Sequence, residues 1–296
     1  MTSLTSVTLP RHSSVKVACR QTMRQVVSAL STLSEPVRSR VRGKALARAA
    51  TLQLDQTVSD SPPVLVLMVY RARNTQLVQI FLRQVDPNAD VRLWALDEIA
   101  PELASQTLGC GPGVRFSHLN SLYNAKPIAQ GSWVVLTDDD VFFHKGSLTK
   151  TIDLMKQGGF SLAQPGQSIL GWWTDLFSIA RPLVRARDTN CVEQGPLVIA
   201  DPAFAEKILP LPEVNDMGWG IEAEWYRTKE GRFRIGIIDD CRVVHWGRVA
   251  NSYPAGPEMK RMHERLAISG IDSIWQLRSV NEYWWKWQQT PSWKKI

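Results

Sequence analysis

The stretch GSWVVLTDDDVFFH at residues 131–144 places three consecutive aspartates between two short apolar runs. Like charges repel one another, and a carboxylate in a low-dielectric site is costly unless a positive charge lies beside it. A solvated turn would avoid that cost, but the apolar residues 133–136 and 141–143 flank the aspartates on both sides. The stretch therefore predicts that the three carboxylates lie at the end of a buried strand. Ligands of α/β folds bind at this position.

Strands alternate with helices on either side of this stretch. The run VLVLMVY at residues 64–70 is continuously apolar, as in a strand buried on both faces. Leu77, Ile80 and Phe81 then recur at helical spacing, and residues 90–96 read as the next strand. Repeated units of this kind predict an α/β fold, with a mainly parallel, Rossmann-like sheet flanked by helices.

The later segments continue this pattern less regularly. We expect a helix at residues 147–157, a strand at 195–200, a helix at 202–208 and a strand at 233–238. The segment that begins at Phe160 has no clear period and predicts long loops over a site.

A basic leader precedes the domain. Residues 1–60 hold nine Lys and Arg but only three acids, so they carry most of the net charge of +7. Such a segment is compatible with a membrane-surface arm, an organellar transit peptide or a solvated helix. The nearly neutral remainder argues against nucleic acid as a partner. We expect a helical or partly disordered leader at 1–61, a catalytic domain at 62–250 and a helical, Trp-rich tail at 251–296.

Neither end of the sequence contains a membrane-spanning signal. No run of 18 apolar residues occurs, and the first residues lack the apolar stretch of a secretory signal. Four widely spaced cysteines indicate neither a zinc site nor a disulfide framework. These features predict a cytoplasmic protein, either soluble or peripheral at the membrane.

The aspartate cluster has the chemistry of a metal site. Side chains alternate along an extended chain, so Asp138 and Asp140 share a face. Hard cations such as Mg²⁺ and Mn²⁺ bind one or two protein carboxylates together with substrate phosphates. An Asp-x-Asp pair alone is weak evidence for a metal site, because short acidic pairs are common in proteins.

Two further stretches of sequence strengthen the prediction of a functional site at the aspartate cluster. In NDMGWGIEAEWYR at 215–227, Gly220 permits close backbone approach, Trp219 offers a stacking face for a sugar, and Glu222 or Glu224 could act as a base. A glycine turn before an amphipathic helix is the structural alternative. In IGIIDDCRVVHWG at 235–247, an apolar strand ends in His245, which could be a metal ligand or an ordinary structural histidine.

The order of these three motifs resembles that of the GT-A glycosyltransferases, over residues 62–250. The resemblance implies a nucleotide-diphosphate sugar as donor, Mn²⁺ or Mg²⁺ held by Asp138, Asp140 and His245, and inverting transfer to an acceptor hydroxyl. The acceptor could be a glycan, a lipid-linked molecule or a small molecule. Many inverting members have Glu-Asp where this chain has Glu222-Ala223, so the base stays open between Glu222 and Glu224.

The same resemblance implies a nucleotide site at the strand ends. The loop after the first strand could meet the nucleotide, an acid after the second strand could bind its base or ribose, and polar residues before the aspartate strand could reach the diphosphate. The residues concerned are Tyr70, Arg71, Arg73, Asp97, Asn124, Lys126 and Asp139.

Other functions compete with this interpretation. A nucleotidyltransferase would share the sheet and the metal but would attack at the α-phosphate, and a catalytically silent protein would only bind the nucleotide sugar. An aspartyl-phosphate phosphatase fits poorly, because Phe142 stands where that class needs a threonine. In the tail, Trp284, Trp285, Trp287 and Trp293 alternate with lysines, which suits either an anionic membrane surface or packing against the domain.

Overall fold

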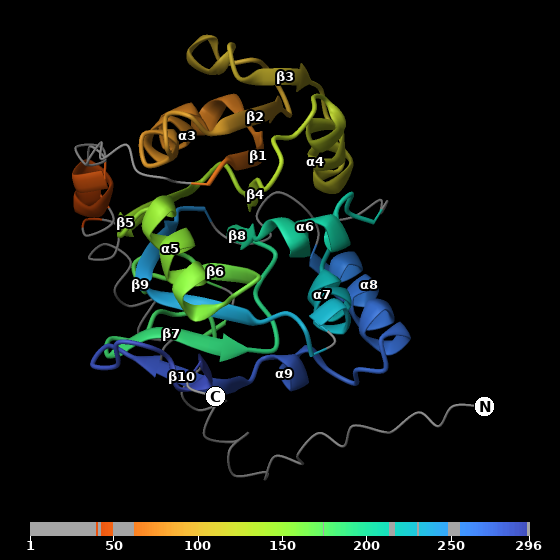
Figure 1. The fold of residues 1–296 in the computed structure, drawn as a ribbon. Helices are drawn as coiled ribbons and strands as arrows, with labels where there is room; N and C mark the ends of the chain where they lie inside the picture. Colours follow the sequence, from red (N-terminus) through yellow and green to blue (C-terminus); the bar gives the residue numbers. More distant parts are fainter. Residues whose placement is uncertain are drawn as a thin grey trace. The chain divides into compact units, whose positions relative to one another are not determined.

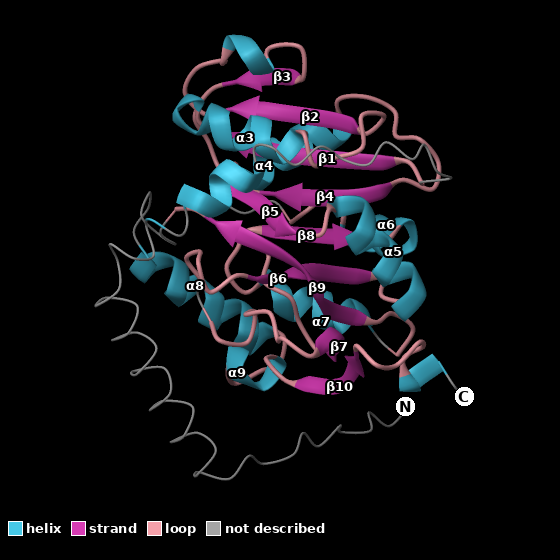
Figure 2. Ribbon diagram, turned by 90° about the vertical axis from the view of Figure 1, so that its left-hand side faces the viewer, coloured by secondary structure: helices cyan, strands magenta, loops and turns pink. Residues whose placement is uncertain are grey.

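The computed structural model describes residues 40, 43–49, 62–173, 175–212, 217–229, 231–247 and 255–294. The basic leader predicted for residues 1–61 therefore lies almost entirely outside the described residues. The described residues form a ten-stranded sheet with the order β10-β7-β9-β6-β8-β4-β1-β2-β3, and β5 pairs with β9 beside this path (Figures 1 and 2).

Most strands run in one direction. Parallel pairs join β3, β2, β1 and β4, and another joins β6 to β9, whereas β5, β7 and β8 run the opposite way. The predicted α/β class with a mainly parallel sheet is confirmed. The strands are β1 (Val64–Tyr70), β2 (Asp90–Ala95), β3 (Thr107–Cys110), β4 (Trp133–Thr137), β5 (Val141–Lys145), β6 (Leu162–Gln167), β7 (Val184–Thr189), β8 (Leu197–Ala200), β9 (Ile235–His245) and β10 (Val280–Trp285).

Helices cover both faces of the sheet, α3 and α5 on one side and α4, α6, α7 and α8 on the other (Figure 1). They are α3 (Thr75–Leu82), α4 (Arg115–Asn124), α5 (Leu148–Gly158), α6 (Pro202–Ile208), α7 (Ile221–Lys229), α8 (Ala255–Ile268) and α9 (Ile274–Leu277), with 3-10 turns η1 (Ala72–Asn74), η2 (Pro101–Leu103) and η3 (Ser292–Lys294).

The two-sided cover explains the apolar run of β1. Val66 and Met68 pack into the core on the α3 and α5 side, whereas Leu65 and Leu67 pack on the α4 side. A central strand has no solvent face, so every position of β1 is buried. The prediction of this strand from continuous hydrophobicity is confirmed.

Two strands lie in a region that the sequence predicted to be loops. Residues from Phe160 onward were expected to be loops, but β6 and β7 lie in this region, and the described residues between them, 168–173 and 175–183, are irregular. The sequence of β6, LAQPGQ, contains proline and glycine, which are poor strand formers. Its position between β8 and β9 nevertheless buries all six residues, so tertiary context overrides local preference.

The C-terminal tail is only partly helical. Helices α8 and α9 are followed by β10, an edge strand that pairs antiparallel with β7. Trp284 is fully buried, and the Trp293 indole donates a hydrogen bond to the Gly158 carbonyl at 2.8 Å. Trp287, in contrast, is 67% exposed. Within the described part of the chain, no helix has the length and apolar character needed to cross a bilayer.

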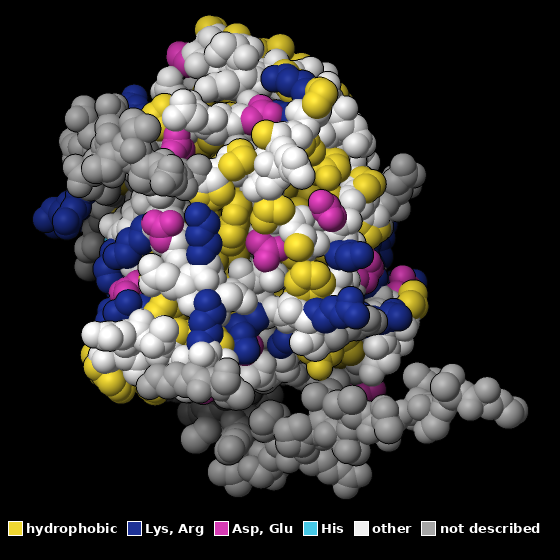
Figure 3. All heavy atoms as spheres, in the orientation of Figure 1, with side chains coloured by type: hydrophobic (Ala, Val, Ile, Leu, Met, Phe, Trp, Pro, Cys, Tyr) yellow, Lys and Arg dark blue, Asp and Glu magenta, His cyan; other side chains and the backbone are white. Residues whose placement is uncertain are grey.

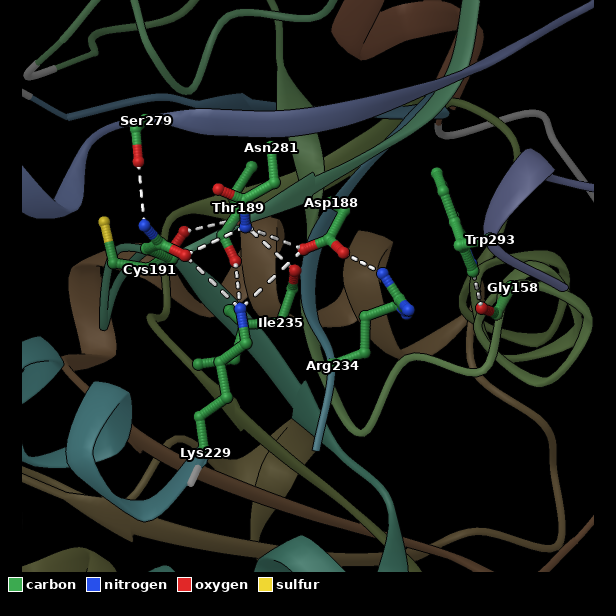
Figure 4. Close-up of polar contacts among 11 residues, drawn as sticks. Gly158, Asp188, Thr189, Cys191, Lys229, Arg234, Ile235, Ser279, Asn281 and Trp293 are labelled. Carbon is green, nitrogen blue, oxygen red and sulfur yellow. Dashed lines mark hydrogen bonds and ion pairs between the residues drawn. The ribbon is translucent and has the colours of Figure 1, made fainter. Parts of the chain in front are cut away.

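Helix α7 is anchored at the amino edge of the sheet. Lys229, its last residue, lies 3.8 Å from the Asp188 carboxylate and 3.3 Å from the Thr189 carbonyl (Figure 4). Asp188 also pairs with Arg234, the residue before β9, and accepts from Asn281 of β10 at 3.2 Å. The network connects α7 to three strands and thereby fixes the helix that begins at the opposite edge.

Candidate active site

The predicted functional residues meet where the parallel strands end. Strands β1, β4, β6 and β9 end at this edge, and the antiparallel β8 begins there. A cavity of about 610 Å³ opens at this edge, and Asp138, Asp139, Asp140, Glu222 and His245 all line it. Residues more than 100 positions apart in the sequence therefore share one site.

Asp138 is held at the cavity by two contacts. Its carboxylate lies 3.0 Å from the Arg115 guanidinium, at the start of α4, and its backbone N–H donates to the Pro196 carbonyl at 2.8 Å. Burial raises the pKa of Asp138, and the Arg115 charge opposes this rise. A Cβ at Gly195 would lie 2.8 Å from an Asp138 oxygen, so the close approach of this loop requires glycine.

Asp140 and His245 are brought together by strand pairing. Antiparallel pairing of β5 with β9 sets Val141 opposite His245, so the preceding Asp140 lies beside the imidazole, with Oδ1 3.1 Å from Nε2. The Asp140 Oδ2 accepts from the Gly247 N–H at 3.0 Å. Although burial opposes both shifts, this pair lowers the pKa of Asp140 and raises that of His245 to about 9.

Asp139 points toward the loop after β1. Its Oδ2 accepts from the Arg71 N–H at 2.7 Å, and Asn74 hydrogen-bonds the same carboxylate. Burial and the neighbouring Asp140 charge raise the pKa of Asp139 to about 6. Asp139 thus fixes the β1 loop next to the other two aspartates.

The side chains of Asp138, Asp140 and His245 fit a divalent cation. Each offers one ligand atom, and these atoms lie within 4.8 Å of one another. Two carboxylate oxygens and an imidazole nitrogen suit Mn²⁺, and two carboxylates alone suit Mg²⁺. A bound cation would also neutralise the clustered carboxylates, beside which Arg115 and His245 already lie.

One of the two candidate bases lies at the cavity. Glu222, the second residue of α7, lines the cavity, whereas Glu224 does not. The Glu222 carboxylate accepts from the Gly220 N–H at 3.0 Å and from the Gln194 N–H at 3.4 Å. Burial raises the pKa of Glu222 despite these donors. Trp219 also lines the cavity. Of the two acids, the geometry therefore favours Glu222 as the base.

Not all predicted nucleotide ligands reach the cavity. Arg71 lines it, but Tyr70 is fully buried, with its hydroxyl 3.0 Å from the Thr107 hydroxyl. The Tyr70 side chain, inside β1, therefore packs into the core and lies outside the cavity lining. Arg73 is exposed on η1 outside the lining. Asp97 accepts from the Ala72 N–H at 2.9 Å at the same edge but outside the lining, so its role stays a prediction.

Asn124 and Lys126 lie at the wrong edge of the sheet. Helix α4 begins beside the cavity at Arg115 and returns to the start of β4, as a crossover helix must. Its last residues therefore lie near the amino edge, where the Lys126 carbonyl accepts from Arg92 at 3.1 Å. Asn124 and Lys126, predicted to reach the diphosphate, therefore lie outside the cavity lining, whereas Arg115 at the start of the helix is part of it.

Sequence reasoning missed several residues of the site. Arg115 followed the glycine-rich turn at residues 109–113, and an arginine at the start of a crossover helix was the available signal. Arg278 lines the cavity from the tail and lies 2.6 Å from Asp175. No local signal marks Arg278, since its position depends on how the tail packs.

Comparison with known proteins gives similarity in structure only. No family model and no curated protein matches the sequence. The crystal structure of GalNAc-T7 with UDP, GalNAc and Mn²⁺ is similar at a TM-score of 0.48 and 9% identity, over 75% of this chain and 54% of that chain. S. aureus TarS 1–349 in complex with UDP-GlcNAc is similar at 0.46 and 12% identity, over 71% of this chain and 66% of that one.

This chain thus spans about half to two thirds of the length of the structures it matches.

Proposed function

We propose that this protein is a metal-dependent glycosyltransferase that moves a sugar, with inversion, from a nucleotide-diphosphate sugar to an acceptor hydroxyl. The observation that supports it is one cavity lined both by the three side chains that could hold a cation, Asp138, Asp140 and His245, and by the Glu222 carboxylate. Inverting transfer needs positive charge at the leaving group and a base on the opposite side of the sugar.

The cation end would hold the diphosphate. When bound, Mn²⁺ or Mg²⁺ stabilises the charge of the departing nucleoside diphosphate. The Arg71 and Arg115 side chains line the same cavity and add two positive charges there. Arg115 is paired with Asp138 at 3.0 Å, so it is already positioned beside the cation ligands.

Glu222 would take the acceptor proton. As the acceptor oxygen bonds to the anomeric carbon and the bond to the diphosphate breaks, the hydroxyl proton moves to the Glu222 carboxylate. Burial raises its pKa, which makes the carboxylate a stronger base than an exposed glutamate. The Gly220 and Gln194 N–H groups fix the orientation of the carboxylate, and Trp219 provides a stacking face for a sugar ring.

The test is incubation of the full chain with a panel of nucleotide sugars and Mn²⁺, with and without EDTA. We expect slow, metal-dependent donor hydrolysis that releases nucleoside diphosphate and free sugar. Release of nucleoside monophosphate or pyrophosphate would instead indicate attack at the α-phosphate, as in a nucleotidyltransferase. Tight donor binding without any turnover would indicate the catalytically silent alternative.

We also propose that the β10 edge contacts an anionic membrane from the cytosolic side. Tyr283, Trp285 and Trp287 form a stacked column with ring centroids 5.1 and 5.0 Å apart, and the Arg181 guanidinium lies 5.1 Å from the Tyr283 ring. Leu183 beside it is 63% exposed. Exposed indoles next to cations suit the headgroup layer. Cosedimentation should show binding to anionic vesicles that weakens with salt, and a lack of binding would reject this contact.

A further inference from the structure

The cavity has two chemically different ends. The cation end is polar and charged, whereas the Trp219 loop and the C-terminal helices contribute many apolar side chains to the lining, beside Glu222, His263, Ser273 and Arg278. These apolar lining residues are Met217, Trp219, Met259, Met262, Ile274 and Trp275. In the space-filling view, hydrophobic side chains likewise gather across the middle of one face, and Lys and Arg are more frequent below them (Figure 3).

The apolar end is built largely by the C-terminal segment. Met259 and Met262 project from α8, and Trp275 lies on α9. Two contacts hold α8 against the Trp219 loop, because Arg265 donates to the Trp219 carbonyl at 2.6 Å and Glu258 accepts from the Met217 N–H at 3.0 Å. The apolar wall is thus a fixed part of the cavity.

This wall offers few partners for hydroxyl groups. Ser273 and His263 are the polar side chains among the lining residues contributed by 255–277, and Arg278 beyond them is paired with Asp175. A buried hydroxyl without a hydrogen-bond partner is unfavourable, because it loses its bonds to water. A polyhydroxylated acceptor would incur this cost repeatedly, whereas a hydrocarbon group would gain from burial against methionine and indole.

The apolar surface continues to the mouth of the cavity. Met259 and Trp275 both line the cavity, yet they are 47% and 42% exposed. A group bound at this wall therefore has an apolar path out to solvent. A long hydrocarbon chain can leave the cavity along this path without entering the charged end.

We propose that the acceptor is amphiphilic, with its reactive hydroxyl at Glu222 and a hydrocarbon portion on the wall formed by Met259, Met262 and Trp275. This inference rests on the proposed function, since it names the class of acceptor for the same site. The donor end keeps the polar half of the cavity, so donor and acceptor occupy regions of opposite chemistry.

The experiment measures binding of hexyl, heptyl and octyl β-glucoside, below their critical micelle concentrations, to the full chain by calorimetry, with glucose as the comparison. We expect the dissociation constant to fall two- to fourfold per methylene, the upper value being about 0.8 kcal/mol per CH₂. Met259→Gln should weaken octyl glucoside binding at least about threefold. Ile268→Gln is the matched control, because Ile268 is 80% exposed on the same helix outside the cavity lining.

Equal affinity across the chain-length series, or an equal effect of both glutamine variants, would overturn the inference. Binding of UDP with Mn²⁺, measured on the same sample, separates this inference from the proposed function. Chain-length dependence without nucleotide binding would retain the apolar subsite and reject the transferase. Nucleotide binding without chain-length dependence would retain the transferase and reject the apolar subsite. Thermal melting of each variant confirms that it is folded.

Discussion

The cation end and the apolar end of the cavity are assembled in different ways. At the cation end, Asp138 and Asp140 belong to the short segment between β4 and β5, and the register of β5 with β9 supplies His245. At the apolar end, Trp219 and Trp275 come from a loop and a short helix, and side-chain contacts such as that of Arg265 hold the pieces together. Backbone pairing fixes the first end, whereas side-chain packing fixes the second.

This difference divides the expected functions of the two ends. A donor diphosphate is the same whatever the acceptor, and it needs charges at fixed positions, which a sheet edge provides. An acceptor is recognised by shape and polarity, which depend on the packing of α8 and α9. Substitutions at the cation end should therefore affect every turnover, including donor hydrolysis, and those at the apolar end should affect acceptor use alone.

The largest effect is expected for Asp140→Asn, which removes a cation ligand but keeps an oxygen for the Gly247 N–H. Metal-dependent donor hydrolysis should fall at least about 1,000-fold, because the cation stabilises the leaving diphosphate by several kcal/mol. Calorimetry should also show loss of Mn²⁺-dependent UDP binding. Asp153→Ala, at an exposed position of α5, is the control. Unchanged metal dependence in Asp140→Asn would show that the cation end of the cavity is not part of the catalytic site.

Glu222→Gln should reduce turnover with acceptor by at least about 100-fold and leave UDP binding intact. The pKa of Glu222 is raised above its ordinary 4.5, and the base must be ionised, so wild-type kcat/KM should rise with pH through that raised pKa. The glutamine variant should lose this rising limb. Glu224→Gln is the control, since Glu224 lies outside the cavity lining. A larger loss in Glu224→Gln would transfer the base role to that residue.

Arg115→Met tests whether the start of α4 serves the donor. The guanidinium lies beside Asp138 and lines the cavity, and a charged hydrogen bond to phosphate contributes about 1.5–3 kcal/mol. UDP binding should therefore weaken about 10-fold or more. Lys126→Met should leave it unchanged, because Lys126 lies at the amino edge. Equal weakening in both variants would indicate a general charge effect instead of a contact.

Much of the fold could be predicted from local pattern. The apolar run of β1, the helical spacing of α3 and the Gly159 cap of α5 all match the structure. Strand β6 could not be predicted, because its Pro165 and Gly166 disfavour a strand and only its neighbours in the sheet stabilise it. Likewise, β10 was expected to be helical, and its pairing with β7 is a long-range contact that sequence periodicity does not report.

The residues of the site likewise include some that local sequence pattern predicted and others that it could not. The sequence predicted that Asp138, Asp140 and His245 lie together, because each follows an apolar strand and parallel strands end at the same edge of a sheet. It predicted Lys126 at the diphosphate because Lys126 is close to the aspartates in the sequence. Lys126 follows the end of α4, however, and therefore lies a helix length from Arg115 and the cavity. It could not predict Met259 or Trp275 as cavity residues, since their positions depend on helix packing.

The smallest effect is expected for Arg265→Met, which removes the hydrogen bond from α8 to the Trp219 carbonyl. The loop that carries Trp219 would lose one of its contacts with the apolar wall, so the KM for acceptor should rise about fivefold, less than the full value of a charged hydrogen bond. Donor hydrolysis and UDP affinity should stay within about twofold of wild type, because no cation ligand moves. Lys260→Met is the control, as it removes an exposed charge from the same helix. A loss of donor hydrolysis in Arg265→Met as large as the loss of acceptor affinity would show that the two ends are coupled, and the division between backbone-built and packing-built halves would then fail.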